Sequence, residues 1–339
     1  METTASAVEP VDLYYQRTKE DLEQADLLPP SFTVRSNNSA PLVTSFLRNW
    51  YEGKHLWFSN KIFAPEGSKQ RALEARKLID LTGDTRYERR TVCIDDLSVD
   101  VLFMTKPSIV NKRWTVISLG IRVLYEEVVA KDSEEGPSAG PLQKAMVAVN
   151  SNFALYNYPG MGANDKNPLS REATIKAHNA LLEFLYAEKK PRQVVDYGQS
   201  FGGFVISEGR ERRPSREGVR TITVLDRTDL QACNILWNDG VITWALNKSL
   251  GWNMSVDLSK EDAPVIGIMN IETNSPVRIY PGDRFTYTDK AVSQATSIAN
   301  ILLNTTKDPV VIGIPGGHND ICPDFSVLGE CIEEVFARL

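Results

Sequence analysis

An apolar run leads directly into a glycine-flanked serine near the middle of the chain, in the pentapeptide Gly198-Gln199-Ser200-Phe201-Gly202. The Gly-x-Ser-x-Gly spacing suits a sharp turn from a strand into a helix, because such a turn leaves room only for very small side chains on either side of the serine. The turn would expose the Ser200 hydroxyl and present the backbone N–H of Phe201 beside it. We therefore predict that Ser200 is a nucleophile; the alternative is a tight turn without a catalytic role.

A serine hydroxyl is protonated at neutral pH and needs a base within hydrogen-bond reach before it can attack a substrate. The chain has three histidines, His55, His178 and His318. His178 falls in a predicted helix among apolar neighbours, and we interpret it as structural. His318 follows an apolar run and a glycine-rich loop late in the chain, and we predict that it is the base. The alternative is a loop histidine that makes an ordinary surface hydrogen bond.

The elements that must position these residues alternate between strand and helix from about residue 90 onward. Apolar or alternating runs predict strands at residues 90–94, 99–104, 114–120, 152–158, 194–197, 221–225, 264–271 and 310–314. Helical patterns occur at residues 122–131, 170–189, 230–250 and 321–339. This alternation predicts an α/β fold with a mostly parallel central sheet of about eight strands flanked by helices. Ligands bind at the carboxyl ends of such strands, which is where Ser200 and His318 fall.

The first part of the chain has a different character. Residues 13–28 and 69–81 have helical patterns, and an aromatic-rich stretch at residues 46–63 lies between them. We expect a helical N-terminal extension at residues 1–89, packed on a main domain at residues 90–339.

These features resemble the α/β-hydrolase superfamily. The turn around Ser200 matches, residues 156–162 (YNYPGMG) resemble the turn after the fourth strand of that fold, and Gly317-His318 resembles its catalytic-histidine loop. Shorter motifs are similar to uncharacterised α/β-hydrolase-like proteins of chlamydiae and legionellae; they lie at residues 114–120, 125–126, 226–228 and 251–253. The resemblance implies a catalytic triad in the order serine, acid, histidine.

The resemblance places the triad acid after the strand at residues 264–271. Asp283 precedes the next predicted helix by the spacing usual in the superfamily, and it is the preferred acid. Glu272, directly at the strand end, is the next choice. Asp289 is interpreted as the start of the following helix, and Asp226 lies at a less common position for the acid.

Two backbone donors are needed to stabilise the oxyanion that forms during acyl transfer. Phe201 supplies the first, and the resemblance assigns the second to Ile121, in the loop after the third strand of the main domain. This loop lacks the His-Gly pattern that often marks it in the superfamily. Gln199 either lines the pocket or points into the fold. Tryptophans at positions 237, 244 and 252 lie where hydrolases often carry a cap, and we interpret them as packing residues.

The function predicted from these residues is a serine hydrolase that transfers an acyl group from a small-molecule or lipid ester or thioester. No cofactor is expected, because the sequence has no phosphate-binding loop, dinucleotide motif or metal-ligand spacing. The alternative is a catalytically weak or inactive effector that binds a host protein or a lipid. The missing His-Gly pattern, the obscure acid and the N-terminal extension favour that alternative.

The bulk properties narrow the class of protein. A net charge of −6 argues against a nucleic-acid binder, which needs a basic face. No apolar run is long enough to cross a bilayer, and the first residues have no secretory signal pattern. The four cysteines are scattered, as in reduced proteins. We therefore expect a cytoplasmic protein, with signal-independent secretion into a host cell as a compatible route.

Overall fold

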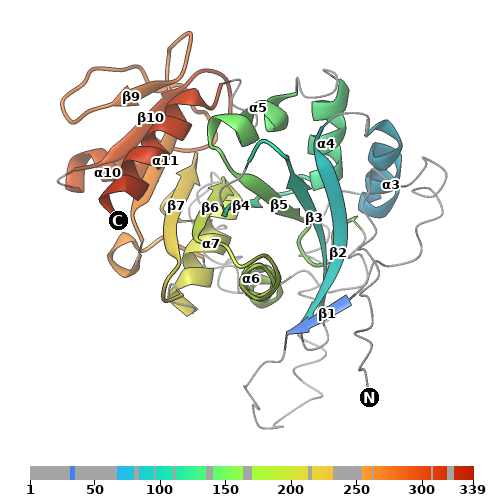
Figure 1. Cartoon of the computed structure of the whole chain (residues 1–339). Helices are drawn as coiled ribbons and strands as arrows, with labels where there is room; N and C mark the ends of the chain where they lie inside the picture. Colours follow the sequence, from blue (N-terminus) through green and yellow to red (C-terminus); the bar gives the residue numbers. More distant parts are fainter. Residues whose placement is uncertain are drawn as a thin grey trace, which may run out of the picture.

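The computed structural model (Figure 1) describes residues 31–34, 67–79, 84–94, 97–109, 112–134, 140–162, 170–212, 216–231, 254–261, 263–306, 308–318 and 324–339, with the backbone alone at residues 31–34 and 133–134. The predicted helix at residues 13–28, the aromatic-rich stretch and the three tryptophans between the sixth and seventh predicted strands lie outside these residues. The predicted helix at residues 230–250 lies outside them except for Leu230 and Gln231, which are not helical.

A single ten-stranded sheet organises the described residues, in the order β1-β2-β3-β5-β4-β6-β7-β8-β10-β9. Its strands are β1 Ser31–Val34, β2 Arg86–Ile94, β3 Leu97–Thr105, β4 Arg113–Ser118, β5 Asn152–Tyr156, β6 Gln193–Gln199, β7 Arg220–Asp226, β8 Val265–Asn270, β9 Val277–Ile279 and β10 Val310–Ile314. Three neighbouring pairs are antiparallel (β2 with β3, β3 with β5, and β10 with β9), and the others are parallel. The expected mostly parallel sheet is confirmed. Its edges carry two strands, β1 and β9, beyond the eight that were predicted.

Helices cover both faces of this sheet, and α4 and α5 lie on the side opposite α6 and α7 (Figure 1). The helices are α3 Ser68–Leu78, α4 Tyr125–Glu134, α5 Pro141–Ala148, α6 Arg171–Phe184, α7 Phe201–Arg212, α10 Ile298–Thr305 and α11 Ser326–Arg338. A π-helical turn at Leu185–Lys189 extends α6, so the predicted helix at residues 170–189 changes its winding near its end.

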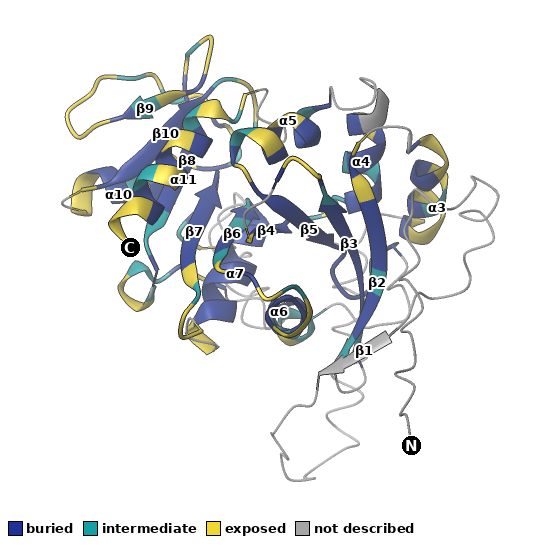
Figure 2. Cartoon of the chain, viewed as in Figure 1, coloured by how far each residue is buried: buried dark blue, intermediate teal, exposed yellow. Residues whose placement is uncertain are grey.

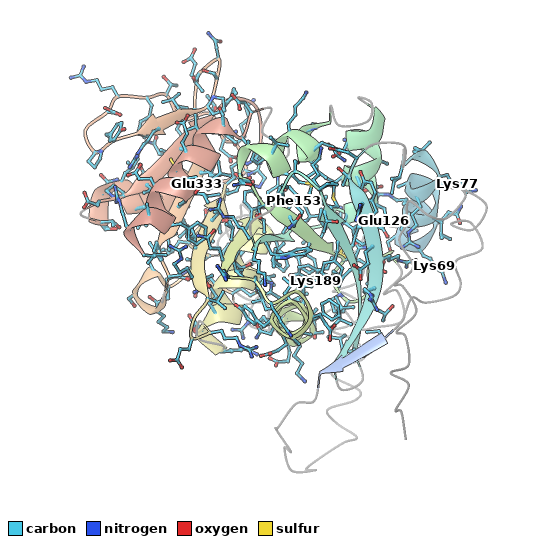
Figure 3. All side chains as sticks on the ribbon, in the orientation of Figure 1. Lys69, Lys77, Glu126, Phe153, Lys189 and Glu333 are labelled. Atoms are coloured by element: carbon cyan, nitrogen blue, oxygen red, sulfur yellow. The ribbon has the colours of Figure 1, made fainter. Side chains whose placement is uncertain are left out.

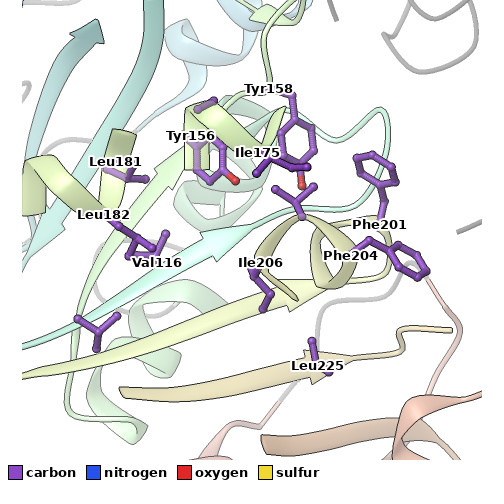
Figure 4. Close-up of a cluster of buried hydrophobic side chains, with 14 of the residues drawn as sticks. Val116, Tyr156, Tyr158, Ile175, Leu181, Leu182, Phe201, Phe204, Ile206 and Leu225 are labelled. Carbon is purple, nitrogen blue, oxygen red and sulfur yellow. The ribbon is translucent and has the colours of Figure 1, made fainter. Parts of the chain in front are cut away.

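Strand side chains alternate between the two faces and build two apolar layers. On β4, Val116 belongs to the layer under α6 and α7, whereas Ile117 belongs to the layer under α5 and α11. Figure 4 shows part of the first layer, in which Val116 lies on the side of Leu181 and Leu182, and Phe204 of α7 lies beside Phe201. The strands and the inward faces of the helices are dark blue in Figure 2, which marks them as buried.

The predicted domain boundary at residues 89/90 falls inside β2, which pairs with β3 along its whole length. Helix α3, also from the predicted extension, packs on α4 through buried charges. The Arg76 guanidinium lies 2.7 Å from Glu126 and 3.1 Å from Asp100. Burial by itself raises the pKa of Asp100, but the guanidinium groups of Arg89 and Arg76 outweigh it and hold that pKa below its usual value. The division into two domains stays a prediction.

Candidate active site

Ser200 lies on the turn between the last residue of β6 and the first residue of α7. Its backbone has a φ of 52°, in the left-handed region that residues other than glycine rarely adopt. Two backbone hydrogen bonds hold this conformation: the Ser200 N–H donates to the Asp226 carbonyl at 2.8 Å, and the Gly203 N–H donates to the Ser200 carbonyl at 3.1 Å. The predicted strand–turn–helix context of the serine is therefore present.

The glycines around Ser200 are required by close backbone contacts. A Cβ atom at Gly198 would lie 2.6 Å from the backbone of Gly203, and one at Gly202 would lie 1.9 Å from the carbonyl oxygen of Ser118. Neither neighbour is a flexible side-chain end that could move aside. The absence of a side chain therefore lets the β6–α7 turn close tightly at Gly198 and pack against the end of β4 at Gly202.

A chain of hydrogen bonds joins Ser200 to a histidine and a carboxylate from distant parts of the sequence. His318 Nε2 lies 2.8 Å from Ser200 Oγ, and its Nδ1 lies 2.9 Å from Asp289 Oδ2. His318 follows β10, and Asp289 lies in the segment between β9 and α10, so both lie at the same end of the sheet as Ser200. The serine and histidine singled out from the sequence are thus brought together.

The carboxylate against His318 is not the one that the spacing favoured. Asp283 is exposed, and its Oδ2 accepts a hydrogen bond from the Tyr280 N–H at 2.8 Å, which closes a turn after β9. Glu272 is also exposed at the end of β8. Instead, Asp289 meets His318, although the sequence pattern indicated only a helix start at that position.

The topology of the sheet explains why Asp289, and not Asp283, contacts His318. After β8 the chain adds the edge strand β9 before it returns to the sheet, where Ile271 and Tyr287 form an isolated bridge. Asp283 belongs to this excursion, whereas Asp289 comes two residues after the return. Because β9 is only three residues long, nothing in its sequence separated it from a loop.

The predicted helix start at Asp289 is wrong, because α10 begins only at Ile298. The Asp289 Oδ1 atom nevertheless accepts hydrogen bonds from the Ala291 and Val292 N–H groups at 2.8 and 3.2 Å. Burial by itself raises the pKa of the Asp289 carboxyl. The hydrogen bond from His318, the charge of that histidine and the two backbone donors outweigh this effect and hold the pKa below its usual value. Asp289 is therefore ionised at neutral pH.

The two predicted oxyanion donors both lie beside Ser200. Phe201 is the first residue of α7, whose N-terminal end carries a partial positive charge. Gly120, which precedes Ile121, places its hypothetical Cβ atom 3.7 Å from the Ser200 Cβ. Ile121 and Gln199 line the same cavity as Ser200, so Gln199 faces this space rather than the core. The donor roles of Phe201 and Ile121 stay predictions.

Arg227 is a site residue that the sequence did not indicate. It is buried, has a φ of 50°, and its Nε and Nη2 atoms each donate to the Asp226 carboxylate at 2.8 Å. Its Nη1 donates to the carbonyl of Gly317, the residue before His318, at 2.9 Å. Burial lowers the pKa of Arg227, but the Asp226 charge outweighs this and raises the pKa above its usual value.

This ion pair explains why Asp226 does not act on the histidine: its carboxylate is held by Arg227 and also accepts the hydroxyl of Tyr197. Asp226-Arg227 stood out in the sequence only as part of a resemblance. No local signal pointed to the contact with Gly317, which lies 90 residues further along the chain.

His178 lies in a separate buried cluster on the other face of the sheet. Its Nε2 is 3.1 Å from Asp196 Oδ2, and its Nδ1 is 3.3 Å from the Tyr156 hydroxyl and 3.4 Å from Ser118 Oγ. The side chains of His178 and Asp196 are fully buried, which fits a structural role. His55 lies outside the described residues.

A cavity of about 890 Å³ opens beside Ser200 and His318 and runs between the sheet and helix α5. We call it the α5 cavity. Its lining comes from β4, β5 and β6 on one side and from α3, α4, α5 and α11 on the other; near Ser200 it includes Ile121, Arg227, Ala291 and Phe325.

The described residues contain neither a candidate metal site nor a candidate membrane-spanning helix. No group of three or more His, Cys, Asp or Glu side chains within them is placed to hold a metal ion. None of the helices found there has the length and apolar character that a bilayer crossing requires.

Comparison with known proteins supports the fold. Solved structures that match include an α/β hydrolase from Vibrio vulnificus, with 13% identity over 89% of this chain and 99% of that chain at a TM-score of 0.51. A fungal esterase structure from Rhizomucor miehei matches with 10% identity over 88% of this chain and 99% of that chain, at a TM-score of 0.50. No curated protein matches the sequence.

A family model described as "Chlamydia CHLPS protein (DUF818)" matches residues 59–311, which is well over half of the chain. The match begins inside the stretch expected to be an extension, in agreement with the inclusion of α3 and β2 in the fold. The resemblance to chlamydial proteins is confirmed. The chain therefore belongs to this family, and it has the fold of the α/β-hydrolase superfamily.

Proposed function

We propose that this protein is a serine hydrolase that cleaves an ester or thioester through the triad Ser200, His318 and Asp289. The observation that carries the proposal is the unbroken hydrogen-bond chain from a strained serine through both ring nitrogens of one histidine to a buried carboxylate. This is the arrangement that makes a serine hydroxyl nucleophilic.

In the first half of the reaction, Ser200 Oγ attacks the substrate carbonyl carbon while His318 Nε2 takes the hydroxyl proton. The N–H at His318 Nδ1 donates to Asp289, which keeps the ring in the required tautomer and stabilises its charged form. The tetrahedral intermediate collapses as the bond from the carbonyl carbon to the leaving oxygen or sulfur breaks. His318 returns its proton to the departing alcohol or thiol, which leaves an acyl group on Ser200.

In the second half, water adds to the acyl carbon and gives a proton to His318. The bond between Ser200 Oγ and the acyl group breaks, a carboxylic acid leaves, and the proton returns to Ser200. The N–H groups of Phe201 and Ile121 would stabilise the oxyanion in both halves, because both residues adjoin Ser200 at the turn and in the β4 loop.

The alternative of an inactive effector rested partly on the lack of an obvious acid. Asp289 supplies a carboxylate in hydrogen-bond contact with His318, which weakens that motive. No described feature favours binding of a host protein over catalysis, so the hydrolase is the function that we propose.

Labelling with a fluorophosphonate probe tests this function, because such probes form a stable bond only with an activated serine. We expect labelling of the wild-type protein and none of Ser200→Ala. Ser259→Ala, at an exposed serine far along the chain, is the matched control and should label like the wild type. An unlabelled wild type, or a Ser200→Ala variant that labels equally, would overturn the proposal.

A further inference from the structure

Alternate residues of two neighbouring strands line the α5 cavity below Ser200: Thr115, Ile117 and Leu119 from β4 and its end, and Val195, Tyr197 and Gln199 from β6. The strand register pairs Thr115 with Val195 and Ile117 with Tyr197, so these side chains form one continuous band. From Val195 to Ser200 the chain advances five residues, which at about 3.3 Å per residue is about 16 Å. The cavity is therefore elongated along the strands and has the serine at one end.

The walls that α5, α11 and β5 supply are apolar, whereas α3 and α4 add charged side chains such as Arg71 and Glu127. Helix α5 contributes Leu142 and Ala145, α11 contributes Leu328 and Ile332, and β5 contributes Phe153, which Figure 3 labels on the sheet near α5. All of these side chains are buried. The part of the lining that α5, α11 and β5 place opposite the band is therefore hydrocarbon.

The hydroxyl groups in the band are turned toward protein partners. Thr115 Oγ donates to Ser151 Oγ at 2.8 Å, and the Tyr197 hydroxyl donates to Asp226. A peptide or sugar laid along the β5, α5 and α11 walls would lose hydrogen bonds to water and gain few in return, which is costly. A hydrocarbon chain would lose none and would gain from burial.

We propose that the α5 cavity binds the acyl chain of the substrate, so that the enzyme prefers esters or thioesters of medium to long fatty acids. This inference rests on the proposed function of Ser200, because the acyl carbonyl must lie at that end. A length of about 16 Å and carbon–carbon bonds of about 1.5 Å correspond to an extended chain of roughly a dozen carbons. The volume also lies in the range of ligand pockets.

Hydrolysis of p-nitrophenyl esters from acetate to palmitate tests the chain-length preference. We expect kcat/KM to rise by up to about fourfold for each added methylene group and to level off near twelve carbons. A wild-type enzyme that is fastest on acetate and slower on every longer ester would overturn this inference and leave the hydrolase proposal intact.

A substitution on α5 tests whether the acyl chain of the substrate lies against this helix. Ala145 is buried and lines the cavity, so Ala145→Phe should remove the gain on long esters while hydrolysis of the acetate stays near the wild-type rate. Val147 lies on the same helix but is 58% exposed, and Val147→Phe is the matched control that should leave the whole series unchanged. Equal chain-length profiles for the wild type and Ala145→Phe would overturn the inference. If Ala145→Phe does not fold, the smaller change Ala145→Val should shorten the preferred chain.

A binding measurement separates this inference from the proposed catalysis. Titration of Ser200→Ala with dodecanoate and with acetate should give saturable heat for dodecanoate alone, and the double variant with Ala145→Phe should lose it. Dodecanoate binding by a protein that hydrolyses no ester would support the cavity and overturn the proposed function. Absence of dodecanoate binding would overturn the inference whether or not the enzyme hydrolyses acetate.

Discussion

At the scale of single residues, the site depends on which carboxylate reaches His318. Two aspartates six positions apart have different surroundings: Asp289 is buried against the ring, and Asp283 is exposed in a turn. Both accept backbone hydrogen bonds, so their local patterns are alike. Burial and the contact with the histidine, which both come from the tertiary structure, distinguish them.

We expect Asp289→Asn to lower kcat by on the order of 10³-fold, because the amide no longer stabilises the charged imidazole and favours the wrong tautomer. Asp283→Asn makes the same chemical change in the exposed turn and should retain the wild-type kcat. Steady-state kinetics on one activated ester compares the two variants. The opposite ranking would reinstate Asp283 as the acid.

At the scale of elements, the β6–α7 turn and the loop after β10 must be held together. The turn is fixed by the backbone hydrogen bond from Ser200 to Asp226 at the end of β7. Arg227 follows directly and donates to the carbonyl of Gly317 before His318. The end of β7 therefore links the nucleophile loop with the histidine loop, which gives the buried Asp226–Arg227 pair a positioning role.

The packing of the turn predicts that substitution by alanine destabilises the protein at one nearby glycine and has little effect at another. Gly202→Ala should lower the free energy of unfolding by about 3 kcal/mol, since the new methyl group would overlap the backbone of Ser118. Gly120→Ala, whose Cβ atom would have no neighbour closer than 3.7 Å, should change it by less than about 0.5 kcal/mol. Urea denaturation followed by circular dichroism measures both. Equal stability of the two variants would contradict the close packing described for the turn.

At the scale of the whole molecule, buried charges attach the first helix of the described fold to the rest. Arg76 on α3 contacts Asp100 of β3 and Glu126 of α4, and Figure 3 labels Glu126 at the α4 end of the sheet. Glu126 also accepts a hydrogen bond from Asn157 after β5, at 2.8 Å. Four segments therefore meet at one set of charges, which makes α3 part of the cooperative fold.

Removal of the Arg76 charge should destabilise the protein strongly. Arg76→Met leaves buried carboxylates without this partner, and we expect a loss of about 3 kcal/mol at pH 7. Arg71→Met on the same helix removes a partly exposed ion pair with Glu127 and should cost less than about 1 kcal/mol. Thermal or chemical unfolding of both variants measures the difference. Equal losses of unfolding free energy in the two variants would show that the buried ion pairs of Arg76 contribute no more to stability than the partly exposed pair of Arg71.

The same pair predicts a pH dependence. The folded-state pKa of Asp100 lies below its unfolded value, so its contribution to stability is present above the unfolded pKa and is lost as the pH falls through the folded pKa. Loss of Arg76 would raise the pKa of Asp100. The stability difference between the wild type and Arg76→Met should therefore narrow below about pH 4, and unfolding curves from pH 7 to pH 3 measure it.

The sequence by itself determined the sharp turn at Ser200 and the order of the main strands and helices around it. The glycine spacing at Ser200 and the alternation of apolar residues are local properties, because they follow from backbone sterics and from the two periodicities of strand and helix. The sequence also allowed the prediction of His318 as the base, because the chain has only three histidines.

Only the tertiary structure decided the partners of these residues. His318 meets Ser200 across 118 positions, and Arg227 meets Gly317 across 90, at distances that no spacing rule covers. The excursion through the short strand β9 leaves Asp283 in an exposed turn and brings Asp289 against His318. The α5 cavity likewise arises where three strands and four helices leave space between them. Such features depend on how separate elements pack, and a linear sequence does not state their packing.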